Sequence, residues 1–171
     1  MNGLEYIVSL ALELLDSSYV FLVIGSGREM QKIVTLVKDK KLDNVFILNS
    51  VPKSEVFKYI AASDYLISTV IDIPELNWNS ANKYFDGLCA GKPVIINHEG
   101  WQALELRSTL SGIVIGKDIK HAGVQLKSIC DEDYDKLKSN VINLSKKYEK
   151  EIIQERLIKI VQNDKGIPNM Y

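Results

Sequence analysis

The feature that most constrains the fold of this chain is an alternation of short apolar runs with stretches of helical periodicity. Residues 19–24 (Tyr-Val-Phe-Leu-Val-Ile) form a continuous run of the kind expected for a strand buried on both faces. Further strands are predicted at 44–48, 64–70, 93–96 and 112–115, and helices at 3–16, 28–41, 54–62, 80–90, 102–110, 121–130, 132–148 and 150–162. This order predicts an α/β fold with a Rossmann-like parallel sheet and helices on both faces.

The composition limits the class of protein. At 171 residues, with 46% hydrophobic and 25% charged residues, the chain is long enough for one domain over 1–171, with a frayed tail at about 164–171. The 21 basic and 22 acidic residues nearly cancel, which disfavours nucleic acid or a membrane surface as a partner. We find no transmembrane segment or leader pattern. We therefore expect a cytoplasmic protein that would reach the inner membrane only through a partner.

The cysteines and histidines indicate neither disulfides nor a metal. Cys89 and Cys130 have no CxxC or metal-type spacing and lie within apolar helical patterns, so we expect buried thiols. His98 and His121 are the only histidines, which makes a histidine-based metal cluster unexpected. His121 is predicted to be exposed in the first turn of a helix.

Ligands of parallel α/β sheets bind beyond the carboxyl ends of the strands, and several polar loops are predicted there. In the first loop, Gly25, Ser26 and Gly27 let backbone approach a ligand, and Arg28 offers a cation for phosphate. Met30 replaces the third glycine of a dinucleotide fingerprint, so a tight strand-to-helix turn is the alternative. The other loops contain Val51 and Pro52, whose backbone could meet a base edge or form a helix entry, then Glu75, Trp78 and Asn79, and finally Asn97, Glu99, Gly100 and Trp101.

The stretch 74–97 carries the strongest chemical signal. A polar loop leads through Ser80, Ala81 and Asn82 into a helix start, where unpaired backbone N–H groups and the helix dipole favour phosphate. Lys83 adds a cation for a diphosphate, and Asp86 adds a carboxylate for ribose hydroxyl groups. An ordinary capped surface helix is an equally weighted alternative. No nucleophile–base pair is legible, because Ser26 lacks the wider elbow pattern.

Several of these segments resemble the C-terminal, donor-binding half of a GT-B glycosyltransferase. The resemblance covers nearly the whole chain, and its most specific part is Asn82-Lys83-Tyr84-Phe85-Asp86-Gly87-Leu88-Cys89-Ala90-Gly91-Lys92-Pro93. The pattern is similar to the retaining family 4 type, which builds bacterial capsule and O-antigen sugars. The other matching segments are 2–7, 23–27, 44–47 with Val51-Pro52, 62–65, and Asn97 with Glu99-Gly100-Trp101-Gln102.

The resemblance implies a role for each loop. Gly25–Gly27 would face the donor diphosphate, the Val51-Pro52 backbone would hold the base, usually uracil, and Asp86 would bind the ribose. The backbone of Ala81–Lys83 and the Lys83 side chain would meet the phosphates. Trp78 stands where the first glutamate of the family's Glu-x7-Glu motif falls, which leaves Glu75 as a weak catalytic candidate. The donor would be a UDP-sugar, with no metal cofactor.

The largest departure from the family lies at the front of the chain. The family has a strand ending in a Gly-rich turn before the Asn2-Gly3 helix, preceded by an acceptor-binding N-terminal domain. That strand would be the middle one of the sheet, so its neighbours must pair with each other or accept a strand from another chain. We therefore predict self-association into a homo-oligomer or a rearranged sheet.

The sequence thus predicts the donor-binding half of a glycosyltransferase, inactive alone, that transfers a sugar from an NDP-sugar to a glycan or lipid-linked acceptor in surface polysaccharide synthesis. The alternative is a non-catalytic nucleotide-sugar-binding subunit that completes an enzyme with a separate acceptor-domain protein. A GT-B-like sugar-nucleotide epimerase is a weaker third hypothesis, because no acid–base set is legible.

Overall fold

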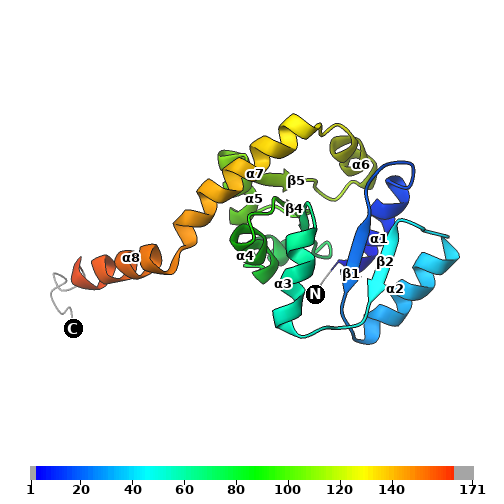
Figure 1. Ribbon diagram of the computed structural model, residues 1–171, viewed down its shortest axis with the longest axis horizontal. Helices are drawn as coiled ribbons and strands as arrows, with labels where there is room; N and C mark the ends of the chain where they lie inside the picture. The colour runs from blue at the N-terminus through cyan, green and yellow to red at the C-terminus, as the bar shows by residue number, and fades with distance from the viewer. Residues whose placement is uncertain (1–2, 164–171) are drawn as a thin grey trace.

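The computed structural model describes residues 3–163 as parallel strands flanked by helices (Figure 1). The tail at 164–171 lies outside the described residues. The alternation of strands and helices confirms the predicted α/β class, and the observed strands are shorter than predicted. The elements are α1 (Leu4–Glu13), β1 (Phe21–Ile24), α2 (Arg28–Asp39), β2 (Val45–Leu48), α3 (Lys53–Ala62), β3 (Leu66–Ser68), the 3-10 helix η1 (Pro74–Trp78), α4 (Asn82–Cys89), β4 (Val94–Ile96), α5 (Trp101–Thr109), β5 (Gly112–Val114), α6 (Ile119–Lys127), α7 (Asp131–Ser145), the 3-10 helix η2 (Lys146–Tyr148) and α8 (Lys150–Asn163).

The strands form two parallel sheets, not one. β1 pairs with β2 in a register that places Phe21 opposite Val45, and β4 lies between β3 and β5. Within residues 3–163, no ladder joins β1 to β3. Pairing of β1 with β3 is therefore not observed, and self-association stays a prediction.

Helix α1 holds the two sheets together from one side. Its buried Ile7, Val8 and Ala11 pack in a cluster with the β1–β2 residues Val23 and Val45. Leu10 of the same helix, and Leu14 directly after it, pack in a second cluster that covers β4 and β5. One helix therefore contributes to both cores, because its apolar stripe is wide enough to face two neighbouring surfaces.

Strand β4 is covered on both faces. Its side chains alternate, so that Ile95 packs in the α1 cluster while Val94 and Ile96 pack with Tyr84 and Leu88 of α4. Helices α5 and α7 complete the cluster that contains Tyr84 and Leu88. Helices therefore lie on both faces of the β3–β4–β5 sheet, as predicted.

The prediction that the first strand is buried on both faces is wrong. Val23 is buried, but Leu22 is 44% exposed, and Phe46 and Leu48 of β2 are also exposed. Helices α1 and α2 cover the face that carries Val23 and Val45, and the alternation of side chains turns the others to the opposite, solvent-accessible face. A continuous apolar run therefore does not guarantee two covered faces.

The prediction of buried thiols is also wrong, since Cys89 and Cys130 are both exposed. Cys89 is the last residue of α4, and Cys130 precedes α7, where its Sγ donates to Asp133 Oδ2 at 3.1 Å. Both residues lie at helix ends, where apolar periodicity no longer predicts burial. His121 is exposed in the first turn of α6, as predicted.

Candidate functional site

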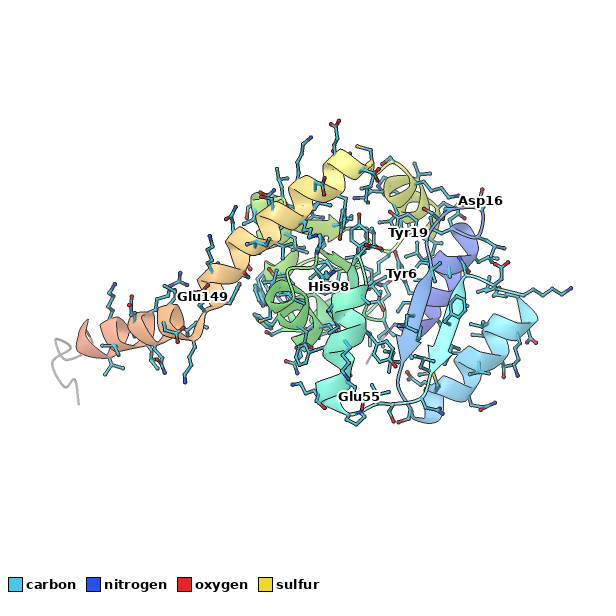
Figure 2. All side chains as sticks on the ribbon, viewed as in Figure 1. Tyr6, Asp16, Tyr19, Glu55, His98 and Glu149 are labelled. Atoms are coloured by element: carbon cyan, nitrogen blue, oxygen red, sulfur yellow. The ribbon has the colours of Figure 1, made fainter. Side chains whose placement is uncertain are left out.

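A cavity of about 510 Å³ lies between α2 and β2 and reaches the loops at the carboxyl ends of β1 and β2. Gly25, Ser26 and Gly27 line it from the turn between β1 and α2, and Asn49 lines it from the end of β2. Helices α2 and α3 both begin at this edge, the lower edge in Figure 1, and Figure 2 labels Glu55 in the first turn of α3 there. The inner wall is mostly apolar and is formed by Met30, Val34, Val37, Val45 and Ile47, together with Gln31 and Lys38.

The start of α2 at this cavity has no side-chain cap. Gly27 occupies the N-cap position with φ 129° and ψ 178°, a conformation that side chains rarely adopt. A Cβ built at Gly27 would have open space around it, so the turn is not crowded by protein atoms. The first N–H groups of a 12-residue helix therefore point toward a site suited to an anion. The side chain of Arg28 is not among those described.

The second predicted loop enters α3 with Pro52 at the N-cap. The Pro52 carbonyl accepts hydrogen bonds from Glu55 N–H at 2.8 Å and Val56 N–H at 3.2 Å. Proline has no N–H, so a base edge at this loop would pair with the backbone of the half-buried Val51.

The start of α4 is the second candidate for a phosphate. Its N-cap, Ala81, supplies no side-chain cap, and the preceding Ser80 and the first helical residue Asn82 are exposed. Burial lowers the pKa of Lys83, and the carboxylate of Asp86 one turn later opposes that shift. The side chain of Lys83 nevertheless stays accessible to solvent, so its positive charge can meet an anion.

The long loop between β3 and α4 is fixed to the sheet at its start. Lys117 Nζ donates to the carbonyls of Val70 at 2.9 Å and Ile71 at 3.2 Å. Burial lowers the pKa of Lys117, against the opposing charge of Asp72. Farther along the loop, Trp78 is 72% exposed.

The loop after β4 packs against η1. Gly100 has φ 103°, and a Cβ built on it would lie 1.8 Å from the Asn77 carbonyl oxygen. The close approach that Gly100 permits is therefore made by the protein's own backbone. Glu99 forms a two-bond pair with Arg107 at 2.5 and 2.7 Å, which lowers the pKa of Glu99. Trp101 packs its ring against Tyr84, with the ring centroids 5.5 Å apart.

Two buried polar side chains in this region have no partner for some of their polar atoms. His98 is 2% exposed, and its Nδ1 lies 2.9 Å from the Glu99 carbonyl oxygen while Nε2 has no described partner. Both amide atoms of the fully buried Gln102 also lack one. Such groups are expected to bind a ligand or an ordered water. Sequence reasoning gave neither residue a role: His98 was a member of the loop after an apolar strand, and Gln102 was the start of a predicted helix.

The structure groups the predicted residues by sheet. Gly25, Ser26 and Gly27 share the cavity with Asn49 at the end of the β1–β2 sheet, whereas Lys83 and Asp86 follow β3 of the other sheet and do not line it. Glu75 lies exposed on η1, within the long loop between β3 and α4. The predicted site therefore consists of two parts on two sheets.

Metal-ligand clusters and membrane-spanning helices are two further features that bear on function in residues 3–163. No cluster of His, Cys, Asp and Glu there could hold a metal ion. No helix in the described part of the chain is long and apolar enough to cross a membrane.

Comparison with known proteins gives a likeness at the level of the fold. No protein-family model and no curated protein matches the chain. Among solved structures it is similar to a mutant of TarM from S. aureus, solved in complex with fondaparinux, alpha-GlcNAc-glycerol and UDP. The TM-score is 0.74 at 16% identity, over 92% of this chain and 32% of that one.

A second similar structure is WaaG, a glycosyltransferase involved in lipopolysaccharide biosynthesis. The TM-score is 0.69 at 16% identity, over 85% of this chain and 39% of that one. The chain spans about a third of the length of these two neighbours, and the likeness establishes the architecture of that third.

Proposed function

We propose that this chain, which has the fold of the GT-B glycosyltransferases, is the donor-binding half of an enzyme that transfers a sugar from a UDP-sugar to a glycan or lipid-linked acceptor. The observation that carries the proposal is the uncapped start of α2 at the mouth of the 510 Å³ cavity. Synthesis of a cell-surface polysaccharide, with the retaining family 4 type of chemistry, belongs to the same proposal. The UDP complex of TarM and the role of WaaG in lipopolysaccharide biosynthesis support it.

The proposed donor lies across both parts of the site. The diphosphate binds the N–H groups at the Gly25–Gly27 turn and the start of α4, where Lys83 adds a positive charge. The uracil pairs with the Val51 backbone, and the ribose hydroxyl groups donate to Asp86. This arrangement uses the two uncapped helix starts for the most highly charged part of the ligand.

The same groups assist departure of the UDP. Negative charge grows on the diphosphate as the bond to the sugar breaks, and fixed N–H dipoles together with the positive charge of Lys83 stabilise that charge. The acceptor hydroxyl group is supplied by a partner domain or a separate protein, so the isolated chain is inactive. A cytoplasmic location, with the partner at the inner membrane, is part of the same proposal.

A second candidate function is a nucleotide-sugar-binding subunit without catalytic residues of its own. It is favoured by the exposed position of Glu75 on η1, outside the cavity, and by the lack of any carboxylate among the described residues that line the cavity. Assay of sugar transfer after adding an acceptor-domain protein distinguishes the two. Glu75→Gln abolishes transfer if Glu75 acts in catalysis and leaves it unchanged if the partner provides every reacting group.

Calorimetric titration with UDP, GDP and UDP-N-acetylglucosamine tests the proposed site. We expect the wild type to bind UDP and Lys83→Ala to bind it at least about tenfold more weakly, as the loss of one charged contact implies. Lys92→Ala, which removes a lysine beyond the other end of α4, is the matched control and should bind like the wild type.

Asp86 is tested with a sugar-modified ligand. Wild type should prefer UDP to 2′,3′-dideoxy-UDP, and Asp86→Asn should lose most of that preference. Absence of UDP binding to the wild type, or equal affinity in the Lys83, Lys92 and Asp86 variants, contradicts the proposed site.

A further inference from the structure

Strand β2 is an edge strand, because within residues 3–163 it has a ladder with β1 alone. Phe21 N–H donates to the Asn44 carbonyl at 2.8 Å, and Gly25 N–H donates to the Leu48 carbonyl at 3.1 Å. Successive residues of a parallel strand alternate the side to which their N–H and C=O groups point. The groups that point away from β1 are therefore those of Val45, Ile47 and Asn49.

Helix α2 lies beside this outer edge of β2 without filling it. The cavity of about 510 Å³ lies between α2 and β2, and Val45, Ile47 and Asn49 are all among the residues that line it. Figure 1 shows α2 beside β2, on the side away from the β3–β4–β5 sheet. The residues whose backbone faces outward thus lie next to open space, where another strand can approach.

The edge of β2 has none of the residues by which proteins protect an exposed strand. Charged side chains and proline are the usual barriers to pairing. Residues 44–51 (Asn-Val-Phe-Ile-Leu-Asn-Ser-Val) contain neither, although 25% of the residues in the whole chain are charged. Lys38 is the one charged residue among the described residues that line the cavity, and it belongs to the last turn of α2. β2 itself therefore carries no barrier to another strand.

One face of the same edge carries an exposed apolar row. Phe46 is 54% exposed and Leu48 is 37% exposed, on the face opposite α1 and α2. Leu22 of β1 lies beside Phe46 in the ladder and is also exposed. A strand that pairs with β2 would cover Phe46 and Leu48, so side-chain burial and backbone pairing favour the same contact.

We propose that β2 pairs with β2 of a second copy of this chain, antiparallel about a two-fold axis at Ile47. A two-fold axis brings the same edge of both copies together and makes the two strands antiparallel. Ile47 exchanges two hydrogen bonds with Ile47 of the second copy, and Val45 exchanges two with Asn49 of the second copy at each end. The two sheets become one sheet in the order β1–β2–β2–β1.

The side chains of this edge suit a copy of itself. In the proposed register Phe46 lies opposite Leu48 of the second copy, so each exposed apolar row covers the other. Self-pairing of a charged edge would place like charges together, and residues 44–51 have no charge. Lys38 lies at the amino end of β2, where Leu42 N–H donates to the Val37 carbonyl at 3.1 Å, so the two Lys38 side chains lie at opposite ends of the pair.

The proposed pairing is independent of the donor site. It needs no nucleotide, and the backbone groups of Val45, Ile47 and Asn49 are not among those proposed to hold the UDP-sugar. It therefore goes beyond the proposed function, and either proposal can fail while the other stands.

Sedimentation and amide hydrogen exchange of the whole chain, without nucleotide, test the pairing. We expect a reversible dimer to form as the concentration rises from about 1 μM to about 200 μM. Exchange at Val45, Ile47 and Asn49 should be at least about tenfold slower in the dimer, with no change at Val23, whose N–H already faces β2. A monomer over the whole range, or a dimer with unchanged exchange at these three residues, overturns the proposal.

A pair of lysine substitutions separates the edge strand from its neighbour. Phe46→Lys places charges on the edge of both copies, so the dimer dissociation constant should rise at least about tenfold. Leu22→Lys is the matched control, because Leu22 lies on the same face with similar exposure but on β1, one strand away from the edge. It should change the dissociation constant less than about threefold. Both side chains are exposed, so both variants are expected to fold, and equal effects contradict pairing through β2.

Helix α8 offers the competing surface for self-association. Its Leu157 is 59% exposed and its Ile160 is 63% exposed. Leu157→Lys should leave the dimer intact. A dimer that is lost in Leu157→Lys and kept in Phe46→Lys would place the interface on α8 and overturn the proposal.

A spin label tests the direction of the pair. The label is attached to Ser50→Cys in a chain whose exposed Cys89 and Cys130 are replaced by serine, and that chain is mixed with an isotope-labelled second copy. The antiparallel pair places Ser50 opposite Asn44 of the second copy, so the amide signal of Asn44 should broaden most. Strongest broadening at Ser50 of the second copy would mean a parallel contact and overturn the two-fold arrangement.

Discussion

The side chain of Asn97 exchanges two hydrogen bonds with the backbone of Val70. Its Oδ1 accepts from Val70 N–H at 2.9 Å, and its Nδ2 donates to the Val70 carbonyl at 3.0 Å. Asn97 follows β4 and is fully buried, while Val70 opens the long loop after β3. The Asn97 side chain thus extends the hydrogen bonding between β3 and β4 by one residue. It also fixes the start of the loop that leads to η1 and α4.

Replacing Asn97 should therefore destabilise the fold. Asn97→Ala removes both bonds and leaves the buried N–H of Val70 without an acceptor, so we expect a loss of about 2–4 kcal/mol in the free energy of unfolding. Urea denaturation measures it. The control is Asn140→Ala, whose amide donates to the Leu110 carbonyl at an exposed position and should cost less than about 1 kcal/mol. Equal losses would show that the Asn97 pair does not stabilise the loop.

Gly100 should tolerate no side chain. An added Cβ would lie 1.8 Å from the Asn77 carbonyl oxygen, and the φ of 103° is itself unfavourable for alanine. We expect Gly100→Ala to lower the free energy of unfolding by about 3 kcal/mol or more, because η1 must move. Gly116→Ala is the matched control, since Gly116 also has a positive φ, of 64°, but has no atom within 4 Å of the added Cβ. It should cost only about 1–2 kcal/mol of backbone strain, and thermal unfolding of both variants provides the comparison.

Glu105 should make stability depend on pH in the acid range. Burial favours its neutral form, but hydrogen bonds from Tyr148 and Tyr84, both at 2.5 Å, and the ion pair with Lys147 outweigh burial and lower the pKa of Glu105. A carboxyl group whose pKa is lower in the folded state than its unfolded value of about 4.5 stabilises the fold at pH values above 4.5. This stabilisation is lost as the pH falls from about 4.5 through the folded pKa.

Glu105→Gln is thus expected to be less stable than wild type by about 1.5–3 kcal/mol near pH 7, with the difference shrinking below pH ~4.5. Urea denaturation at pH 7, 5, 4 and 3 measures this trend. Glu99→Gln removes the exposed pair with Arg107 and should cost less than about 1 kcal/mol, and less again in high salt. A constant difference between wild type and Glu105→Gln at every pH would contradict the assignment.

The local pattern of the sequence predicted much of the fold. The α4 helix and the turn after it were predicted from a short segment that ends at Gly91. Gly91 has a positive φ of 65°, as expected at the end of a helix. The break after Tyr148 was also predicted, and Figure 1 shows α8 extending away from the sheets beyond it. The loops at the carboxyl ends of β1 and β2 were predicted as site residues, and Gly25–Gly27 line the cavity there.

The burial of individual side chains could not be predicted in the same way. Cys130 looked like part of an apolar stripe, yet it precedes α7 and is exposed. His98 and Gln102 are polar residues that the fold buries without a partner for every polar atom. Whether a residue is covered depends on which distant segment packs against it, and that information is not contained in local periodicity.

The sequence by itself determined the order of strands and helices, because apolar periodicity and helix-stop residues act over a few neighbouring positions. Only the tertiary structure decided that β1 and β3 do not pair with each other, that α1 joins two separate cores, and that Asn97 fixes the loop after β3. These outcomes depend on hydrogen bonds and contacts between residues far apart in the chain.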